Sequence, residues 1–333
     1  MKPYLVDVPV LYHVWCRPEV QRQTFERIRE ARPSVLFLSS DAGRNEEEWA
    51  KIRQSREIVE NIDWDCKVYK LYYDTNQGMY ATARQARAAI FAEYDRFIDM
   101  EDDVLADPSF FRYCAELLER YKDDERIHSI LGENPLGKWE KPNSDYFFCH
   151  GFASWGYASW KRSWDPMYDR AWMDDPYLIE VLTQHVTPNF AKNIADVKAT
   201  GMYDGHPAGS EFFFEVDNWL QTRLCIFPKY NLCRNIGATD DATHAVDLKK
   251  LDHWTQRKFT TPVYSLTFPM KHAKYVIEDL GFRNELRKTA AGSWRYYVGR
   301  GITIGKRLYY GDAPILWQKF VKRVIKREKE IET

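Results

Sequence analysis

Six consecutive residues, Asp99-Met100-Glu101-Asp102-Asp103-Val104, place three adjacent carboxylates directly after an apolar, strand-like run. Like charges this close cost stability unless a cation or a hydrogen-bond donor neutralises them. Strand alternation puts Glu101 and Asp103 on one face and Asp102 on the other. Hard oxygen ligands of this kind suit Mg²⁺ or Mn²⁺, and such an ion can bridge two phosphates. The triplet therefore indicates a metal and phosphate site, and a plain polar turn is the weaker alternative.

The elements that would position this triplet alternate between strands and helices. Strand-like runs occupy residues 8–15, 34–40, 66–72 and 96–100, and helix-like segments lie between them at 17–31, 46–62 and 81–94. This alternation predicts an α/β fold, Rossmann-like, with a doubly wound and mostly parallel sheet flanked by helices. Ligands of such sheets bind at the carboxyl ends of the strands, where Arg17, Asp41 and the triplet fall.

The second half of the chain has weaker signals. We expect a helix that begins at Pro108 with Asp107 as its cap, a strand at 127–131, helices at 176–186 and 211–224, and an apolar strand at 225–228. Residues 139–172 are aromatic and irregular. The chain is therefore divided into residues 1–105, residues 106–250 and a C-terminal basic, helical or irregular extension, 251–333.

Composition narrows the class of protein. The 333 residues are 44% hydrophobic with a formal net charge of -1, which offers no basic field for nucleic acid. No leader-like amino terminus and no apolar stretch of membrane-spanning length is visible, so a cytoplasmic protein is expected. Six cysteines without metal-ligand spacing are expected to be reduced and buried. In residues 317–325 apolar residues fall opposite lysines, which fits a peripheral contact with the inner face of a membrane or a helix packed on the domain.

Several of these motifs occur together in one known family. The order Cys16-Arg17-Pro18, Ser40-Asp41, Asn76-x-Gly78 and Glu101-Asp102-Asp103 resembles bacterial GT-A proteins of the nucleotide-diphospho-sugar transferase or hemolytic-protein-like group. These are distantly similar to N-acetylglucosaminyltransferase I. The resemblance continues through the segments 155–162, 231–232, 235–237 and 241–244, read as WGYASWKR, NL, NIG and DATH. It implies a GT-A domain in which residues 1–105 bind the nucleotide sugar and residues 106–250 bind the acceptor.

The resemblance also implies an activity. It is that of a metal-dependent, inverting glycosyltransferase that moves a sugar from a uridine diphosphate donor, such as UDP-GlcNAc, to a hydroxyl of a bacterial surface glycan or lipid-linked glycan. Asp103 would bind Mn²⁺ or Mg²⁺, Asp102 the ribose and Glu101 the donor sugar. The other residues that match donor or metal positions are Arg17, Asp41, Arg84 and His244.

The base and the acceptor site are less determined. In the relative the base is an Asp before a Trp on a later helix, which corresponds to Asp217 here, with Glu215 as the second candidate. An inverting transfer needs one such group to take the proton of the acceptor hydroxyl. Trp155 and Trp160 fit the wall of an acceptor cleft, and fit equally well a wedge between the sheet and a covering loop.

Two other functions fit parts of this pattern. A sugar-1-phosphate nucleotidyltransferase would need a glycine-rich triphosphate loop after the first strand, and residues 13–18 contain no glycine. A non-catalytic carbohydrate-binding or assembly protein could keep the same fold. The acidic triplet together with a candidate base favours catalysis over this second alternative.

Overall fold

A computed structural model describes residues 1–165, 169–203, 206–238 and 253–289, together with positions 298, 301, 302, 304, 305 and 308. His244, the second of the two predicted metal ligands, lies outside this part of the chain, as do residues 317–325, which carried the membrane prediction. Within it, every helix is too short or too polar to cross a bilayer.

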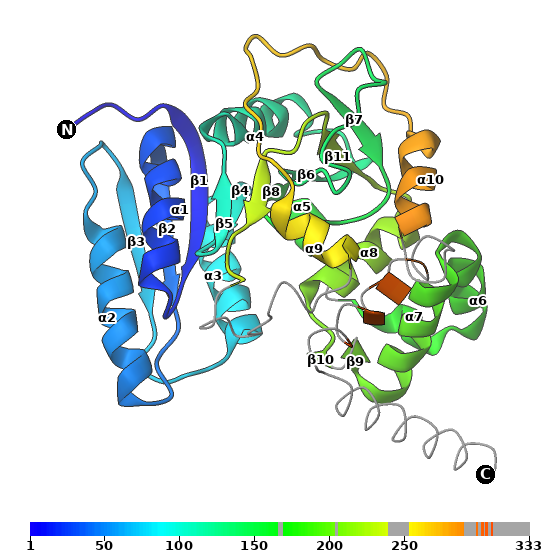
Figure 1. Cartoon of the computed structure of the whole chain (residues 1–333), viewed down its shortest axis with the longest axis horizontal. Helices are drawn as coiled ribbons and strands as arrows, with labels where there is room; N and C mark the ends of the chain where they lie inside the picture. The colour runs from blue at the N-terminus through cyan, green and yellow to red at the C-terminus, as the bar shows by residue number, and fades with distance from the viewer. Residues whose placement is uncertain are drawn as a thin grey trace.

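One eight-stranded sheet organises the molecule, in the order β3-β2-β1-β4-β8-β6-β11-β7 (Figure 1). β3, β2, β1 and β4 are parallel neighbours, β6 and β11 are parallel to each other, and β8 and β7 run antiparallel to their partners. This confirms the predicted α/β class with a mostly parallel, Rossmann-like sheet. The strands span Val6–Val14 (β1), Pro33–Ser40 (β2), Lys67–Tyr72 (β3), Arg96–Glu101 (β4), Ile127–Leu131 (β6), Tyr146–Cys149 (β7), Tyr157–Trp160 (β8) and Leu224–Pro228 (β11).

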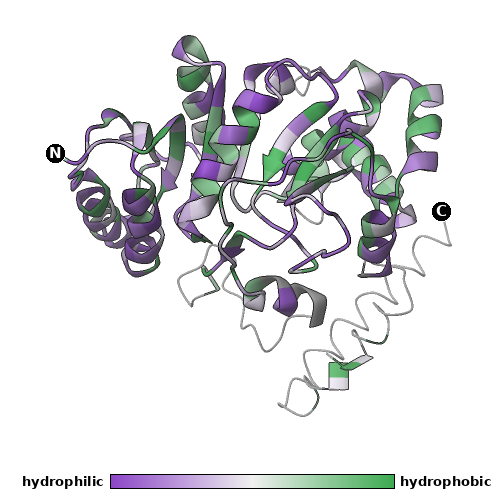
Figure 2. Cartoon of the chain, turned by 90° about the horizontal axis from the view of Figure 1, so that it is seen from above, coloured by the Kyte–Doolittle hydropathy of each residue, from purple (hydrophilic) through white to green (hydrophobic). Residues whose placement is uncertain are grey.

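Helices cover the sheet with their apolar faces inward, and Figure 2 shows hydrophobic residues concentrated on the strands and on the helix sides next to them. Asp107 caps α4 by accepting a hydrogen bond from the Ser109 N–H at 2.9 Å, as predicted. The helices span Pro18–Ala31 (α1), Glu46–Glu60 (α2), Met79–Glu93 (α3), Pro108–Arg120 (α4), Lys161–Trp164 (α5), Pro176–His185 (α6), Pro188–Thr200 (α7), Ser210–Leu220 (α8), His253–Thr260 (α9) and Leu280–Thr289 (α10).

A small ladder outside the main sheet reaches the acidic triplet. β5, Val104–Ala106, pairs antiparallel with β12, Cys233–Asn235, and the Ile236 N–H then donates to the carbonyl of Asp103 at 2.8 Å. The two-residue strands β9 (Met202–Tyr203) and β10 (His206–Pro207) form a separate ladder. The first of these ladders brings Gly237 next to the carboxylate of Asp103.

A second, smaller core lies beside the sheet domain, at the lower right of Figure 1. It is formed by α6, α7, α8 and the 3-10 helix η2, Ala171–Asp174, and its buried residues include Trp172, Leu182, Phe190 and Ile194. Helix α8 also carries Phe214, which packs in the main core. α8 therefore joins the two cores.

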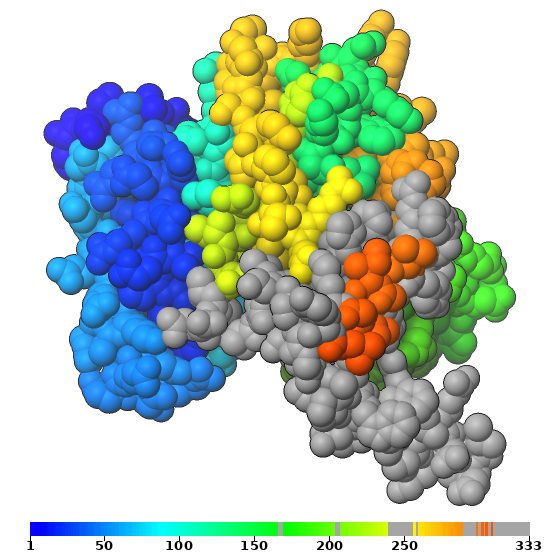
Figure 3. All heavy atoms as spheres, viewed as in Figure 1, coloured from blue at the N-terminus to red at the C-terminus, as the bar shows by residue number. Residues whose placement is uncertain are grey.

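The segment 261–279 crosses the sheet domain between α9 and α10. Its gold atoms are visible on the side of the molecule that faces the viewer in Figure 3. Backbone N–H groups of Leu266 and Lys271 donate to Ser109 and Asp145 at 2.9 and 2.7 Å. Leu266 and Met270 are buried. The first part of the predicted C-terminal extension is thus packed onto the domain.

The prediction of an irregular stretch at 139–172 was wrong, since it contains β7, β8 and α5, and the helix α7 was not predicted. All four residues of β8 are buried. A strand buried on both faces shows no alternation of polar and apolar residues, so its period is invisible in the sequence.

Candidate functional site

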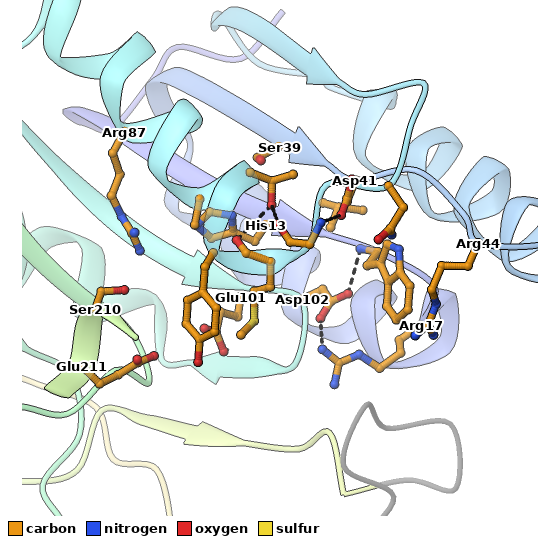
Figure 4. A pocket seen from close by; sticks show the side chains of 18 residues that line it. His13, Arg17, Ser39, Asp41, Arg44, Arg87, Glu101, Asp102, Ser210 and Glu211 are labelled. Atoms are coloured by element: carbon orange, nitrogen blue, oxygen red, sulfur yellow. Dashed lines mark hydrogen bonds and ion pairs between the residues drawn. The ribbon is translucent and has the colours of Figure 1, made fainter. Parts of the chain in front are cut away.

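A cavity of about 320 Å³ opens at the carboxyl ends of β1, β2 and β4. The first turns of α3 and α8 close its other side (Figure 4). Its polar lining residues are His13, Trp15, Arg17, Ser39, Asp41, Arg44, Asn76, Tyr80, Thr82, Arg87, Glu101, Asp102, Ser210 and Glu211. The structure thus brings together Arg17, Asp41, Glu101 and Asp102, which were predicted from the sequence as donor-binding residues.

Arg17 holds the acidic triplet from the turn between β1 and α1. Its Nη2 donates to Asp102 Oδ1 at 2.5 Å and its Nη1 to Asp103 Oδ2 at 2.7 Å. The second oxygen of Asp102 accepts the Trp15 N–H at 3.0 Å. Burial, opposed by the guanidinium of Arg17, raises the pKa of Asp102 to about 6. Arg17 is therefore the main counter-charge of these two carboxylates in the described structure.

Asp41 fixes the loop before α3. Its Oδ1 accepts the N–H groups of Ala42 and Gln77 at 2.8 and 3.0 Å, and its Oδ2 accepts the Gly78 N–H at 2.8 Å. Asn76 adds a bond from its amide nitrogen to the Ala42 carbonyl at 2.7 Å. Both oxygens of Asp41 are thus occupied by backbone donors, and the carboxylate shapes one wall of the cavity.

Glu101 and Glu211 face each other across the cavity from β4 and from the first turn of α8 (Figure 4). Burial raises the pKa of Glu101 well above its usual range, and the nearby charges of Asp103, Asp99 and Glu211 raise it further. This pair of carboxyl groups is well placed for contact with a hydroxylated ligand.

A buried network lies beneath the cavity floor. Asp99 accepts bonds from Arg87 Nη2 at 3.1 Å and from the Tyr157 hydroxyl at 2.8 Å, and its other oxygen lies 3.2 Å from His13 Nε2. Burial alone would raise the pKa of Asp99, but His13 and Arg87 outweigh it and lower that pKa to about 2. The network fixes the side chains of His13 and Arg87, two basic residues that line the cavity.

The residues that the structure describes do not by themselves form a divalent-metal site. In this part of the chain no group of three His, Cys, Asp or Glu side chains is arranged to hold a metal. Asp103 binds Arg17 through Oδ2, whereas its buried Oδ1 has no hydrogen-bond partner among the described residues. That orphaned oxygen is a candidate ligand, but further ligands would have to come from a bound diphosphate, from water or from residues outside the described ranges.

Asp217, the first candidate for the base, lies in a different place. It lines a second cavity of about 400 Å³ between η2, α6 and α8, together with Asp169, Trp172 and Asp175. Its Oδ2 is 3.7 Å from Arg223 and 3.9 Å from His128. Burial raises the pKa of Asp217 to about 6, against the opposing charge of Arg223. Neither Asp217 nor Glu215 is among the residues that line the first cavity.

The remaining predicted residues do not reach the first cavity. Arg84 is exposed on α3, and Arg87, three residues later, lines the cavity instead. Trp160 is 2% exposed and donates its indole N–H to the Leu118 carbonyl at 3.2 Å. Trp155 packs near Phe259, with ring centroids 5.1 Å apart. The two tryptophans thus lie in or against the core, and their predicted acceptor role gains no geometric support.

Several cavity residues were missed from the sequence, and some had a detectable signal. Ala83, Ala86 and Ile90 mark the buried face of α3, and Arg87 falls on that face four residues after Ala83. Arg44 follows β2 by four residues and lies over the Trp15 ring at 5.0 Å. Glu211 had no comparable signal, because its position depends on how α8 docks against the sheet.

No protein-family model and no curated protein matches the chain. Among solved structures it is similar to UDP-glucose pyrophosphorylase complexed with UDP-glucose, at 10% identity over 68% of this chain and 91% of that one, with a TM-score of 0.32. Mouse xyloside xylosyltransferase 1 in its apo form gives 14% identity over 66% and 84%, with a TM-score of 0.33. UTP-bound UGPase from Acinetobacter baumannii gives 12% identity over 69% and 88%, with a TM-score of 0.35. Likeness this remote identifies neither an activity nor a site.

Proposed function

We propose that this protein is an inverting glycosyltransferase that moves a sugar from a nucleotide diphosphate donor to a hydroxyl of a glycan. The observation that carries the proposal is the cavity at the carboxyl ends of β1, β2 and β4. Three arginines line it, of which Arg17 and Arg44 lie together at one end, and the carboxyl groups of Glu101 and Glu211 face each other across it. Arginine side chains form charge-assisted hydrogen bonds with phosphate oxygens, and carboxyl groups accept hydrogen bonds from sugar hydroxyls.

Arg17 and Arg44 lie at the end of the cavity opposite Glu211. The third lining arginine, Arg87, lies at the Glu211 end, where Asp99 is its partner at 3.1 Å. Figure 4 shows Arg17, Arg44 and Asp102 at one end and Ser210 and Glu211 at the other. A donor would place its diphosphate by the arginines, its nucleoside near Asp41 and Asp102, and its sugar near Glu101. The volume of about 320 Å³ is at the small end of the usual range for ligand pockets.

Four parts of this proposal rest on the sequence resemblance. They are the inverting outcome, a uridine nucleotide, dependence on Mn²⁺ or Mg²⁺, and an acceptor on a bacterial surface glycan. For the metal, Asp103 Oδ1 is the candidate ligand within the described residues. A bound divalent ion would offset the negative charge of a departing nucleoside diphosphate.

Calorimetric titration of UDP, GDP and CDP, each with and without Mn²⁺, tests the function. We expect one nucleotide to bind the wild-type protein and Asp103→Asn to lose the metal-dependent part of that affinity. Asp217→Asn is the matched control, because it replaces a buried carboxylate in the second cavity. If no nucleotide binds under any condition, the proposal is wrong, and a glycan array should then test a non-catalytic carbohydrate-binding function.

Gly237→Ala provides a test that does not alter any charged group. An added Cβ would lie 2.3 Å from Asp103 Oδ2 and 2.8 Å from Arg17 Nη1. We expect the overpacking to lower the free energy of unfolding by about 1–3 kcal/mol and to weaken nucleotide binding. Gly201→Ala is the control: its φ of +70° makes alanine cost about 1–2 kcal/mol, yet it lies outside the cavity. Equal nucleotide affinity in both variants would contradict a role for the Arg17 and Asp103 pair.

A further inference from the structure

We infer that Glu211, and not Asp217 or Glu215, is the general base that takes the proton of the acceptor. This inference rests on the function proposed above. The residues that line the cavity include the carboxyl groups of Asp41, Glu101, Asp102 and Glu211. A base must lie in the same cavity as the donor and must keep an oxygen available to the acceptor hydroxyl.

Two of these carboxylates are already fully engaged. Both oxygens of Asp41 accept backbone N–H groups of residues 42, 77 and 78. Both oxygens of Asp102 are taken by Arg17 and by the Trp15 N–H. In the part of the chain that the structure describes, no hydrogen bond or ion pair engages the carboxyl group of Glu101 or Glu211.

Position separates Glu211 from Glu101. Glu101 lies in the middle of the cavity, beside Asp102, where the resemblance places the donor sugar. Glu211 lies at the end of the cavity remote from Arg17 and Arg44. In an inverting displacement the acceptor approaches opposite the leaving group, so a base belongs at the end remote from the cations that hold the diphosphate.

Helix geometry excludes Asp217 from this role. Six residues along α8 correspond to about 9 Å of rise and about 240° of net rotation. Glu211 and Asp217 therefore open into different cavities, as observed. Asp217 is 4% exposed, and its Oδ2 lies toward Arg223 and His128.

The reaction step balances without any further reactant. The acceptor oxygen forms a bond to the anomeric carbon of the donor sugar while its proton passes to Glu211. The bond from that carbon to the phosphate oxygen breaks, and its electron pair leaves with the nucleoside diphosphate. Water can replace the glycan hydroxyl as acceptor, in which case the sugar is released and the donor is hydrolysed.

The test compares Glu211→Gln, Glu215→Gln and Asp217→Asn with the wild type, and uses Glu180→Gln, an exposed glutamate on α6, as the control. UDP affinity is measured by calorimetry, and UDP release is measured from UDP-glucose, UDP-galactose and UDP-N-acetylglucosamine in water. We expect Glu211→Gln to keep its UDP affinity while its rate falls about 10²–10⁴-fold. Azide needs no proton removed, so adding it should restore turnover to Glu211→Gln and yield a glycosyl azide.

The outcomes distinguish Glu211 from Asp217 and Glu215 as the general base. A Glu211→Gln variant with wild-type turnover, or one that azide does not restore, overturns the inference. The inference is also overturned if Asp217→Asn or Glu215→Gln loses more turnover than Glu211→Gln and azide restores it. It is overturned as well if the wild type binds UDP but releases no UDP from any donor, even with azide. A wild type that binds no nucleotide at all instead refutes the proposed function itself.

Discussion

Replacing Arg17 with methionine is expected to lower the free energy of unfolding by about 3–5 kcal/mol at pH 8. The guanidinium is the shared partner of Asp102 and Asp103, at 2.5 and 2.7 Å. All three side chains are largely buried, so removing the cation leaves two adjacent carboxylates without a counter-charge. Urea denaturation followed by circular dichroism measures the change.

The stability lost in Arg17→Met should increase as the pH rises. The pKa of Asp102 in the folded protein, about 6, exceeds its ordinary value, so the charged form destabilises the fold as pH rises from about 4 through 6. Without Arg17 this penalty grows and extends to higher pH. The difference between wild type and variant should therefore be small at pH 4 and full at pH 8.

Arg44→Met is the matched control for Arg17→Met. Arg44 also lines the cavity and pairs with Glu48, but its side chain is 60% exposed. An exposed pair of this kind contributes at most about 1 kcal/mol. If both arginine variants are equally stable at pH 8, the buried ion pairs of Arg17 do not form in solution.

Asp99→Asn is expected to cost about 3–5 kcal/mol above pH 5, because it leaves Arg87 buried without its carboxylate partner. The pKa of Asp99 is lowered to about 2 in the folded protein. A carboxyl group with a lowered pKa stabilises the fold above its unfolded pKa, near 4, and that contribution is lost as pH falls toward 2. The difference between wild type and variant should therefore shrink between about pH 4 and pH 2.

Asp63→Asn provides the comparison for Asp99→Asn. Asp63 also pairs with two cations, Lys2 and Arg29, but its side chain is 40% exposed. The expected change in stability is small, because solvent screens an exposed ion pair. An Asp99→Asn variant whose stability deficit stays constant down to pH 2 would show that Asp99 does not carry the buried charge assigned to it.

The first half of the sheet could be predicted from the sequence because strands and helices alternate there. Its four strands end at residues 14, 40, 72 and 101. Arg17, Asp41 and the triplet follow these strand ends directly, so their convergence needed only the rule for parallel sheets. The second half was harder. β8 enters the sheet between β4 and β6 from a distant segment and is buried on both faces.

The far side of the cavity depends on tertiary packing. Arg87 replaces Arg84 because the buried face of α3 is set by its small residues. Glu211 replaces Asp217 at the cavity because the docking of α8 between two cores selects which of its faces meets β4. The rotation of α3 and of α8 about their axes is not encoded in a local motif, so a match at the Asp217 position could not decide which acid lines the cavity.

The clamp made by Asp41 has a consequence for the redesign of this pocket. It holds the loop at 77 and 78 through their backbone N–H groups, and this clamp does not involve the side chain of Met79. Met79 is exposed and lines the cavity, whereas the exposed Gln77 does not line it and accepts a hydrogen bond from Gln85 at 2.6 Å. A library of variants at Met79 is expected to alter ligand preference while the scaffold keeps its shape, provided that Asp41 is left unchanged.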